Sequence, residues 1–237
     1  MSLEYDKITA HHYAAYRPLL HVQILQEVLS SKNKADLGLD VGCGTGQSSI
    51  ALTNFCKKVI GIEPSQEMLD KVIVHPNVKY AYYDCEHIAY EDNLFDIVTF
   101  AGSLFYGKSQ LLLDETIRVS KNNGQTITYD FNILLDPVLE SIGVKPNVHT
   151  INYNHSEDFS GLRTNNMELV NKTEKPVQLE ISTTNLTHLL LSSKDNYSLL
   201  QAYFGSNNLY QKVLEALQDN TTDIEAMTYI TSYKVTK

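Results

Sequence analysis

Three glycines at every second position, Gly42, Gly44 and Gly46, directly follow the short apolar segment 37–41. The apolar segment predicts a strand, and a helix is expected over residues 45–55. Glycine adopts positive φ at little steric cost and lets a ligand approach the backbone closely. Open parallel sheets bind ligands at the carboxyl ends of their strands, so the loop predicts an α/β domain with a ligand site at this turn. An ordinary tight turn without a ligand is the alternative.

The spacing of the glycines indicates which ligand the loop binds. A dinucleotide-binding loop has the pattern Gly-x-Gly-x-x-Gly, but here the third glycine comes one residue early and Gln47 stands in its place. A phosphate-binding loop is excluded because no Gly-Lys-Ser/Thr sequence follows. Glu63, at the end of the next predicted strand, can accept hydrogen bonds from both ribose hydroxyls, in an NAD site or an S-adenosylmethionine site. The loop spacing favours S-adenosylmethionine.

Periodic apolar segments predict the remaining strands and helices. Strands are expected at 58–62, 77–82, 95–101 and 125–131, and helices at 17–30, at 109–120 and after Ser65, with Met68, Leu69, Val72 and Ile73 as an apolar face. Asn122-Asn123-Gly124 predicts a turn. Beyond a mixed segment at 132–176, strands are expected near 177–183 and 226–235 and helices near 186–193, 195–204 and 208–218. Five strand-then-helix units predict a parallel sheet with helices on both faces.

Charge and cysteine content narrow the range of functions. Acidic residues number 28 against 19 basic ones, and only three of the basic residues are arginines, Arg17, Arg118 and Arg163. A nucleic-acid partner is disfavoured because binding to its backbone depends on Lys and Arg contacts. Three cysteines without Cys-x-x-Cys spacing and eight histidines without metal-ligand spacing predict neither a disulfide framework nor a metal site.

The chain also lacks the sequence features of export and membrane insertion. Its first residues contain no apolar core of a signal peptide. No apolar segment approaches the roughly 20 residues that span a bilayer. The expected location is therefore cytoplasmic, with no membrane span.

Several short motifs resemble, in their order along the chain, those of class I S-adenosylmethionine-dependent methyltransferases. They are LDVGCGTG, VIGIEPSQEML, YYDCE, FDIVTFAGSLFYG and RVSKNNGQTI. The segment HHYAAYRPLLHVQILQEVL also resembles the entry helix of a subgroup that includes enzymes similar to trans-aconitate methyltransferase and the type-11 methyltransferases. The resemblance covers roughly residues 11–131.

This resemblance implies a Rossmann-like α/β fold. Its sheet would have seven strands, mostly parallel, with helices on both faces, an antiparallel last strand and a cap inserted after the fifth strand. A single domain is expected, with a cofactor-binding half at 1–131, a substrate cap at 132–176 and elements that complete the sheet at 177–237.

The resemblance also implies a set of residues that bind S-adenosylmethionine. The set is Tyr13, Asp40, Gly42, Cys43, Gly44, Gly46, Glu63, Pro64, Met68, Asp84, Cys85, Ala101 and Gly102. Asp40 and the backbone of the glycine loop would face the methionine end of the cofactor, and Glu63 would bind the ribose hydroxyls. Ala101 and Gly102 would line the passage to the methyl group.

The adenine end of the cofactor would meet residues after the second and third strands. Pro64 and Met68 would pack near the ring, Asp84 would accept a hydrogen bond from the adenine amine, and Cys85 would offer its backbone N–H. Alternatively, Met68 belongs to the helix core and Asp84 is a turn or cap residue. Cys43 is expected to fill space in the loop rather than to act as a nucleophile.

The methyl acceptor is less well defined by the sequence. After the fourth strand there is no Asp/Asn-Pro-Pro-aromatic sequence, which argues against an amino acceptor, and no Pro-Cys pair, which argues against a pyrimidine carbon. Relatives in the subgroup often have His-Trp where this chain has Phe105-Tyr106, so Tyr106 carries the only hydroxyl there. Tyr106 and Arg17 are the candidate residues for positioning the substrate. Tyr13 and Arg17 would close over the cofactor or substrate, or Arg17 pairs with a neighbouring carboxylate.

The segment 132–176 is expected to cover the substrate. It contains His149, Tyr153, His155 and Arg163. Because arginine binds carboxylates through two parallel hydrogen bonds, Arg17 and Arg163 would suit a carboxylic acid acceptor. The predicted function is methyl transfer to a small molecule. The alternatives are a cofactor-binding protein without transferase activity and an NAD-dependent oxidoreductase.

Overall fold

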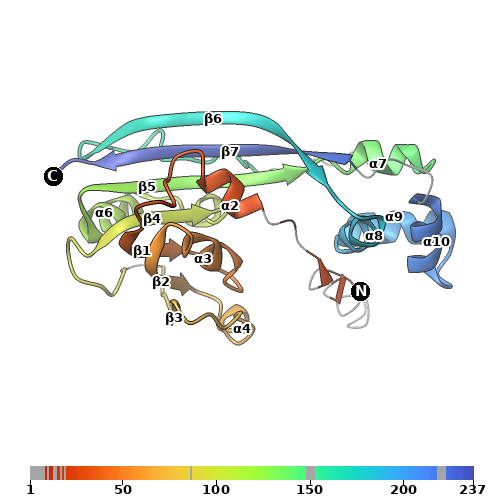
Figure 1. Cartoon of the computed structure of the whole chain (residues 1–237), viewed down its shortest axis with the longest axis horizontal. Helices are drawn as coiled ribbons and strands as arrows, with labels where there is room; N and C mark the ends of the chain where they lie inside the picture. Colours follow the sequence, from red (N-terminus) through yellow and green to blue (C-terminus); the bar gives the residue numbers. More distant parts are fainter. Residues whose placement is uncertain are drawn as a thin grey trace. The chain divides into compact units, whose positions relative to one another are not determined.

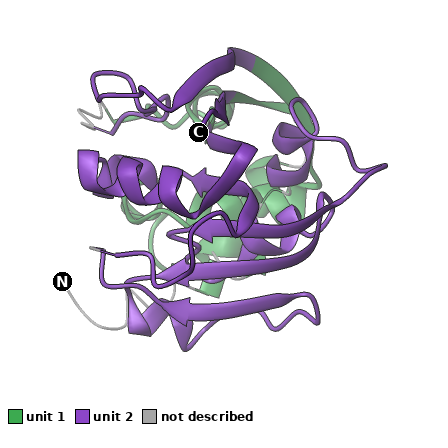
Figure 2. Cartoon of the chain, turned by 90° about the vertical axis from the view of Figure 1, so that its left-hand side faces the viewer, with its two compact units in different colours: residues 1–18, 132–152, 176–227 green, residues 19–131, 153–175, 228–237 purple. Residues whose placement is uncertain are grey.

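The computed structural model describes residues 9, 11–12, 15–16, 18, 20–85, 87–147, 153–217 and 223–237. The chain divides into two compact units (Figure 2). Unit 1 comprises residues 1–18, 132–152 and 176–227, and unit 2 comprises residues 19–131, 153–175 and 228–237. None of the described helices is both long and apolar enough to cross a membrane.

The described strands form one seven-stranded sheet in the order β3-β2-β1-β4-β5-β7-β6 (Figure 1). They are β1 Ala35–Val41, β2 Cys56–Glu63, β3 Val78–Tyr82, β4 Phe95–Ala101, β5 Ser120–Ile133, β6 Met167–Glu180 and β7 Asp223–Val235. Strands β1 to β5 pair in parallel. Strand β7 runs in the opposite direction to β5 (Figure 1). This arrangement confirms the predicted mostly parallel sheet with an antiparallel last strand.

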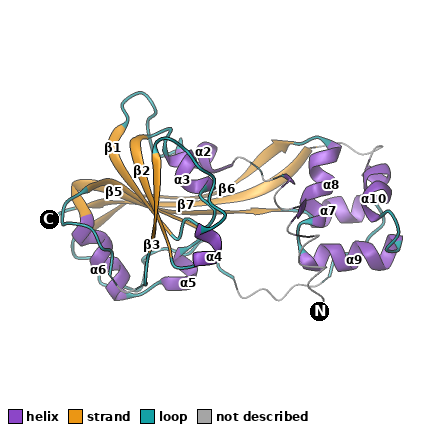
Figure 3. Ribbon diagram, turned by 90° about the horizontal axis from the view of Figure 1, so that it is seen from below, coloured by secondary structure: helices purple, strands orange, loops and turns teal. Residues whose placement is uncertain are grey.

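Helices lie on both sides of the strands of unit 2. They are α2 Leu20–Leu25, α3 Gln47–Leu52, α4 Gln66–Leu69, α5 Leu104–Gly107 and α6 Gln110–Val119. Figure 3 shows α2 and α3 on one side of the strands and α5 and α6 on the other. Unit 1 contains α7 Asp136–Ser141, α8 Thr183–Leu191, α9 Lys194–Phe204 and α10 Leu209–Leu217.

Each unit has its own apolar core. In unit 2, residues of β1 and β4 such as Leu39, Val98 and Phe100 pack against Leu113 of α6. In unit 1, α8, α9 and α10 pack together around buried leucine and valine side chains. Fully burying one such side chain stabilises the fold by about 1.5–3 kcal/mol. Many side chains of β1 and β4 are buried in the core of unit 2, which holds the ends of these strands in place at the candidate site.

The turn predicted at Asn122-Asn123-Gly124 lies inside β5. Ser120 pairs with Phe95, and Gln125 pairs with Ile97, so β5 has three more residues than β4 between these two pairs and bulges. Asn123 has a positive φ of 63°, and a Cβ on Gly124 would lie 2.9 Å from the Lys121 carbonyl oxygen. The turn residues therefore bend the strand locally without ending it.

The predicted helix after Ser65 is shorter than expected, and its apolar face is not buried. Helix α4 ends at Leu69, and Met68 and Ile73 remain 46% and 45% exposed. The backbone of Ile73 leaves the helix because its N–H donates to the Thr45 carbonyl and its carbonyl accepts from the Tyr80 hydroxyl. The interpretation of Met68 as helix core is wrong.

Two further boundaries differ from the prediction. Strand β6 begins at Met167, ten residues before the predicted strand, because it lies at the sheet edge and many of its side chains are exposed and polar. Helix α2 spans only Leu20–Leu25, within the helix predicted at 17–30, although Leu29 is also buried. The segment 132–176 therefore contains α7 and most of β6, and its role as a substrate cap stays a prediction.

Candidate functional site

A cavity of about 390 Å³ lies at the carboxyl ends of β1, β2 and β4, within unit 2. Its lining comprises Val41, Gly42, Gly44, Glu63, Pro64, Met68, Tyr83, Cys85, Phe100, Ala101, Gly102, Ser103, Tyr106, Gly107 and Leu112. Nine of these residues are ones that the sequence indicates for cofactor or substrate: Gly42, Gly44, Glu63, Pro64, Met68, Cys85, Ala101, Gly102 and Tyr106. The structure thus brings separate motifs together around one space.

The glycine loop forms one wall of the cavity. Gly42, Gly44 and Gly46 all have positive φ, at 72°, 54° and 93°. A Cβ on Gly42 would lie 2.5 Å from Cβ of Ser103, and one on Gly46 would collide with the Tyr80 hydroxyl. A Cβ on Gly44 would have no protein atom within 4 Å beyond its chain neighbours, so the backbone there faces open space in which a ligand fits.

Glu63 ends β2 and supplies the carboxylate of the cavity. Its side chain is buried, its Oε2 accepts from the Gly44 N–H at 2.9 Å, and its Oε1 accepts from the Ser65 N–H at 3.1 Å. Each carboxylate oxygen has two acceptor positions, so both oxygens can still accept from a ligand hydroxyl. The arrangement suits a ribose diol.

Asp40 does not line the cavity. It is fully buried on β1, and its carboxylate accepts from Ser48 at 2.6 Å, Ser49 at 2.7 Å and Thr99 at 3.0 Å. Burial raises the pKa of this carboxyl group, and the three hydroxyls partly offset that rise. These hydrogen bonds connect β1 to the first turn of α3 and to β4, so Asp40 stabilises the elements on either side of the glycine loop.

Cys43 lies in the loop but, like Asp40, does not line the cavity. It is 4% exposed, and burial raises the pKa of its thiol well above the usual range. A thiol that keeps its proton is a poor nucleophile, because the thiolate is the reactive form. This geometry agrees with its predicted role as a space-filling residue.

The adenine end of the predicted site is open to solvent. Pro64, Met68 and Cys85 line the cavity there, and Cys85 has a positive φ of 68°. Asp84 is exposed, lies outside the cavity lining and accepts a hydrogen bond from the His87 N–H at 3.1 Å. Its predicted contact with the adenine amine stays a prediction.

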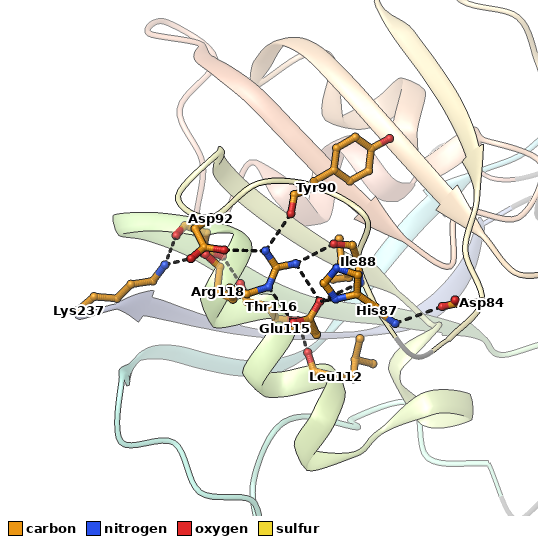
Figure 4. A network of polar contacts seen from close by, with 11 residues as sticks. Asp84, His87, Ile88, Tyr90, Asp92, Leu112, Glu115, Thr116, Arg118 and Lys237 are labelled. Atoms are coloured by element: carbon orange, nitrogen blue, oxygen red, sulfur yellow. Dashed lines mark hydrogen bonds and ion pairs between the residues drawn. The ribbon is translucent and has the colours of Figure 1, made fainter.

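The loop after β3, which carries Cys85, is held by Arg118 on α6 (Figure 4). The guanidinium donates two hydrogen bonds to Glu115, at 2.7 and 2.9 Å, and one to Asp92 at 2.7 Å. It also donates to the carbonyls of Ile88 at 2.7 Å and Tyr90 at 2.8 Å. Each guanidinium nitrogen therefore has a partner, which fixes the loop that borders the cavity.

Residues 39–128 match a family model described as "Methyltransferase domain". This segment of the chain is therefore similar to a methyltransferase domain. A Dictyostelium discoideum protein named as a methyltransferase is 28% identical over 123 residues, which are 52% of this chain and 47% of that protein. The demethylmenaquinone methyltransferase of Staphylococcus aureus is 33% identical over 117 residues, which are 46% of this chain and 48% of that enzyme. The chain thus spans about half the length of these relatives.

The fold of the chain also resembles that of a solved structure. A solved structure from Anaeromyxobacter dehalogenans, assigned as a type II methyltransferase, superposes with a TM-score of 0.64 over 93% of this chain and 98% of that one. The two sequences are 15% identical, so the likeness concerns the fold alone.

Several predicted residues lie elsewhere in the molecule or outside the described part. Tyr13, Arg17 and His149 are not among the described residues. Arg163 is exposed, and its backbone pairs with the Gln110 side chain on the surface, at 2.9 and 3.2 Å. The lining of the cavity in the described chain contains no Lys or Arg, and no described cluster of His, Cys, Asp or Glu could hold a metal ion.

Other residues at the cavity were not indicated by the sequence. Tyr83 and Ser103 line the cavity, and the Ser103 hydroxyl donates to the Val41 carbonyl. Asp130, near the end of the predicted fifth strand, lies close to Gly102 and was also not indicated. Its position at a strand end was the one feature that could have indicated it.

Proposed function

We propose that this chain is an S-adenosylmethionine-dependent methyltransferase that acts on a small molecule. The observation that carries the proposal is the pairing of an open backbone at Gly44 with the Glu63 carboxylate, 2.9 Å apart, at the edge of a 390 Å³ cavity. A cavity of this size, with a mostly apolar lining and few polar groups, is typical of a site for a cofactor-sized ligand.

The residues present fit the parts of S-adenosylmethionine. Glu63 would accept from the ribose hydroxyls, Pro64 and Met68 would contact the adenine, and the backbone of the glycine loop would face the methionine end. When bound, the cofactor supplies an activated methyl group. The chain then has to hold donor and acceptor in line and exclude water, which contributes on the order of 7–11 kcal/mol in well-oriented reactions.

The acceptor is proposed to be a small molecule rather than a nucleic acid, because the chain has a net charge of −9. A carboxylic acid remains one candidate, with Arg17 as its partner. The three cysteines are all free, which is typical of proteins from a reducing compartment, so a cytoplasmic location is part of the proposal.

The proposal is tested by titrating S-adenosylhomocysteine and NAD into the protein in a calorimeter. We expect binding of S-adenosylhomocysteine alone, and a loss of about 10- to 100-fold in affinity for Glu63→Ala, since hydrogen bonds to a charged group contribute about 1.5–3 kcal/mol. Glu67→Ala, an exposed glutamate on α4, is the matched control and should bind normally. Preference for NAD, or unchanged affinity in Glu63→Ala, would contradict the assignment.

Turnover is tested separately with labelled S-adenosylmethionine and a panel of small acids, phenols and quinols. Transfer of label to any of them supports the enzyme. Tight binding without transfer to any compound, including those of a cell extract, would favour a cofactor-binding protein without transferase activity.

A further inference from the structure

Three polar side chains, Asp130, Tyr153 and His155, form a cluster next to Gly102 within unit 2. The Asp130 Oδ2 accepts from the Tyr153 hydroxyl at 2.9 Å and lies 2.8 Å from Nδ1 of His155. The Tyr153 hydroxyl also lies 2.8 Å from the carbonyl oxygen of Gly102. The three side chains do not line the cavity itself, but they line a small neighbouring hollow that shares Gly102 and Phe100 with it.

Asp130 and Tyr153 can approach the backbone at position 102 closely because this residue is a glycine. A Cβ at this position would lie 3.1 Å from Oδ1 of Asp130 and 3.2 Å from the Tyr153 hydroxyl, and Gly102 has a φ of 67°. The Tyr153 ring also packs against Phe105, with ring centroids 4.6 Å apart, and against Tyr106 at 5.8 Å. The polar group is therefore held by an aromatic wall shared with the cavity.

The carboxylate of Asp130 determines where the proton of His155 lies. An ionised carboxylate has no proton to give, so Nδ1 of His155 must donate, and a neutral ring then has its lone pair on Nε2. The described residues provide no hydrogen bond to Nε2. The side chains of His155 and Asp130 are 29% and 17% exposed, so the pair is mostly buried but a ligand can still reach it.

Of the other charged groups around His155, Glu157 and Lys172 are already paired. Tyr229 stacks on the ring at 5.8 Å, and Glu157, Lys172 and Glu174 line the neighbouring hollow. Glu157 forms an ion pair with Lys108 at 2.6 Å, and Lys172 forms one with Asp158 at 2.9 Å. Asp130 is thus the carboxylate that contacts the His155 ring in the described chain.

We propose, on the basis of the methyltransferase function above, that His155 is the catalytic base for an acceptor with a weakly acidic hydroxyl, such as a phenol or an enol. Asp130 and Tyr153 are the positioning residues. In the reaction, the O–H bond of the acceptor breaks and its proton passes to Nε2 of His155. The oxygen forms the new bond to the methyl group, and the electron pair of the old methyl–sulfur bond remains on sulfur. Asp130 neutralises the resulting imidazolium.

A carboxylate acceptor would fit this site less well. It loses its proton without help and needs no base. It would also find no Lys or Arg in the described lining of the cavity. A neutral hydroxyl acceptor would contact the apolar lining and give its proton to His155.

The first test measures the protonation of His155 directly, without any acceptor. Long-range proton–nitrogen spectra of the histidine rings should show a protonated Nδ1 and a bare Nε2 for His155, with the signal assigned by its loss in His155→Gln. Asp130→Asn should reduce the share of this form, and Asp114→Asn, an exposed aspartate on α6, should not. A proton on Nε2 in the wild-type protein would overturn the proposal.

The second test compares methyl transfer to phenol with transfer to 4-nitrophenol, which ionises far more readily. His155→Gln should lose about 100-fold or more on phenol, the usual contribution of a general base, and much less on the nitrophenol. His75→Gln, on the loop before β3, should behave as wild type on both phenols. An equal loss on both phenols, or no loss, would contradict the role of His155.

Calorimetry with S-adenosylhomocysteine separates this inference from the function on which it rests. Unchanged binding in His155→Gln and Asp130→Asn is expected. Absence of binding to the wild-type protein would instead overturn the proposed methyltransferase. If the protein binds S-adenosylhomocysteine and methylates small carboxylic acids but neither phenol, only the proposal of a hydroxyl acceptor is overturned. If no probe is methylated, the spectra of the histidine rings decide whether His155 has the proposed protonation.

Discussion

Gly42, Gly44 and Gly46 lie in one loop, yet their surroundings differ. The backbone of Gly42 touches Ser103 and that of Gly46 touches Tyr80, whereas Gly44 faces the cavity. The alternating glycines therefore serve two purposes. Gly42 and Gly46 allow close packing of the protein, and Gly44 leaves room for a ligand.

This difference predicts that one alanine substitution mainly lowers stability and another mainly weakens ligand binding. Gly42→Ala should destabilise the fold by about 2–4 kcal/mol, since it adds a clash to the cost of a side chain at positive φ. Gly44→Ala should cost only about 1 kcal/mol of stability but weaken S-adenosylhomocysteine binding at least tenfold, because its methyl group enters the cavity. Urea denaturation and calorimetry on both variants measure the two effects. Equal stability losses with normal binding in Gly44→Ala would contradict this account.

Helix α6 stabilises the loop after β3 through one ion-pair network (Figure 4). The hydrogen bonds from Arg118 lower the pKa of the Glu115 carboxyl below its ordinary value of 4.5. A carboxyl group whose pKa is lower in the folded state stabilises the fold above its unfolded pKa, and this contribution is lost as the pH falls through the folded value. The network should therefore weaken in acid.

Arg118→Gln should lower the free energy of unfolding by about 2 kcal/mol at neutral pH, because it leaves the Glu115 carboxylate without its main partner. The difference from wild type should shrink as the pH falls below 4.5, where Glu115 becomes protonated. Urea denaturation at several pH values measures it. Lys57→Gln removes an exposed ion pair with Asp36 and should cause no measurable change. A difference that stays constant with pH would exclude Glu115 as its cause.

The buried strands are easier to predict than the edge of the sheet. Strand β4 spans Phe95–Ala101, as predicted, because its apolar run is buried and a glycine follows it. Strand β6 begins ten residues before its predicted start because its exposed residues carry no apolar alternation. A pattern of burial can be read from a sequence only where the side chains are in fact buried.

At the scale of the whole molecule, the candidate site combines residues that are predictable with others that are not. Gly44 comes after the end of β1 and Glu63 is the last residue of β2, so the parallel pairing of these strands brings their positions together. Asp130, Tyr153 and His155 meet because a segment more than twenty residues later in the chain returns to β5. No local pattern in the sequence encodes that return.

The chemistry of Cys85 shows whether this cavity holds S-adenosylmethionine. Cys85 is exposed and lines the cavity, whereas Cys43 and Cys56 are 4% and 1% exposed, so iodoacetamide should modify Cys85 alone. Burial raises the pKa of its thiol, so the reaction is run in alkaline buffer and followed by peptide mass spectrometry, with Cys85→Ser as the control. We predict that saturating S-adenosylhomocysteine slows alkylation in proportion to its occupancy and that NAD does not. An unchanged rate of Cys85 alkylation, with binding verified by calorimetry, would show that the cofactor binds elsewhere.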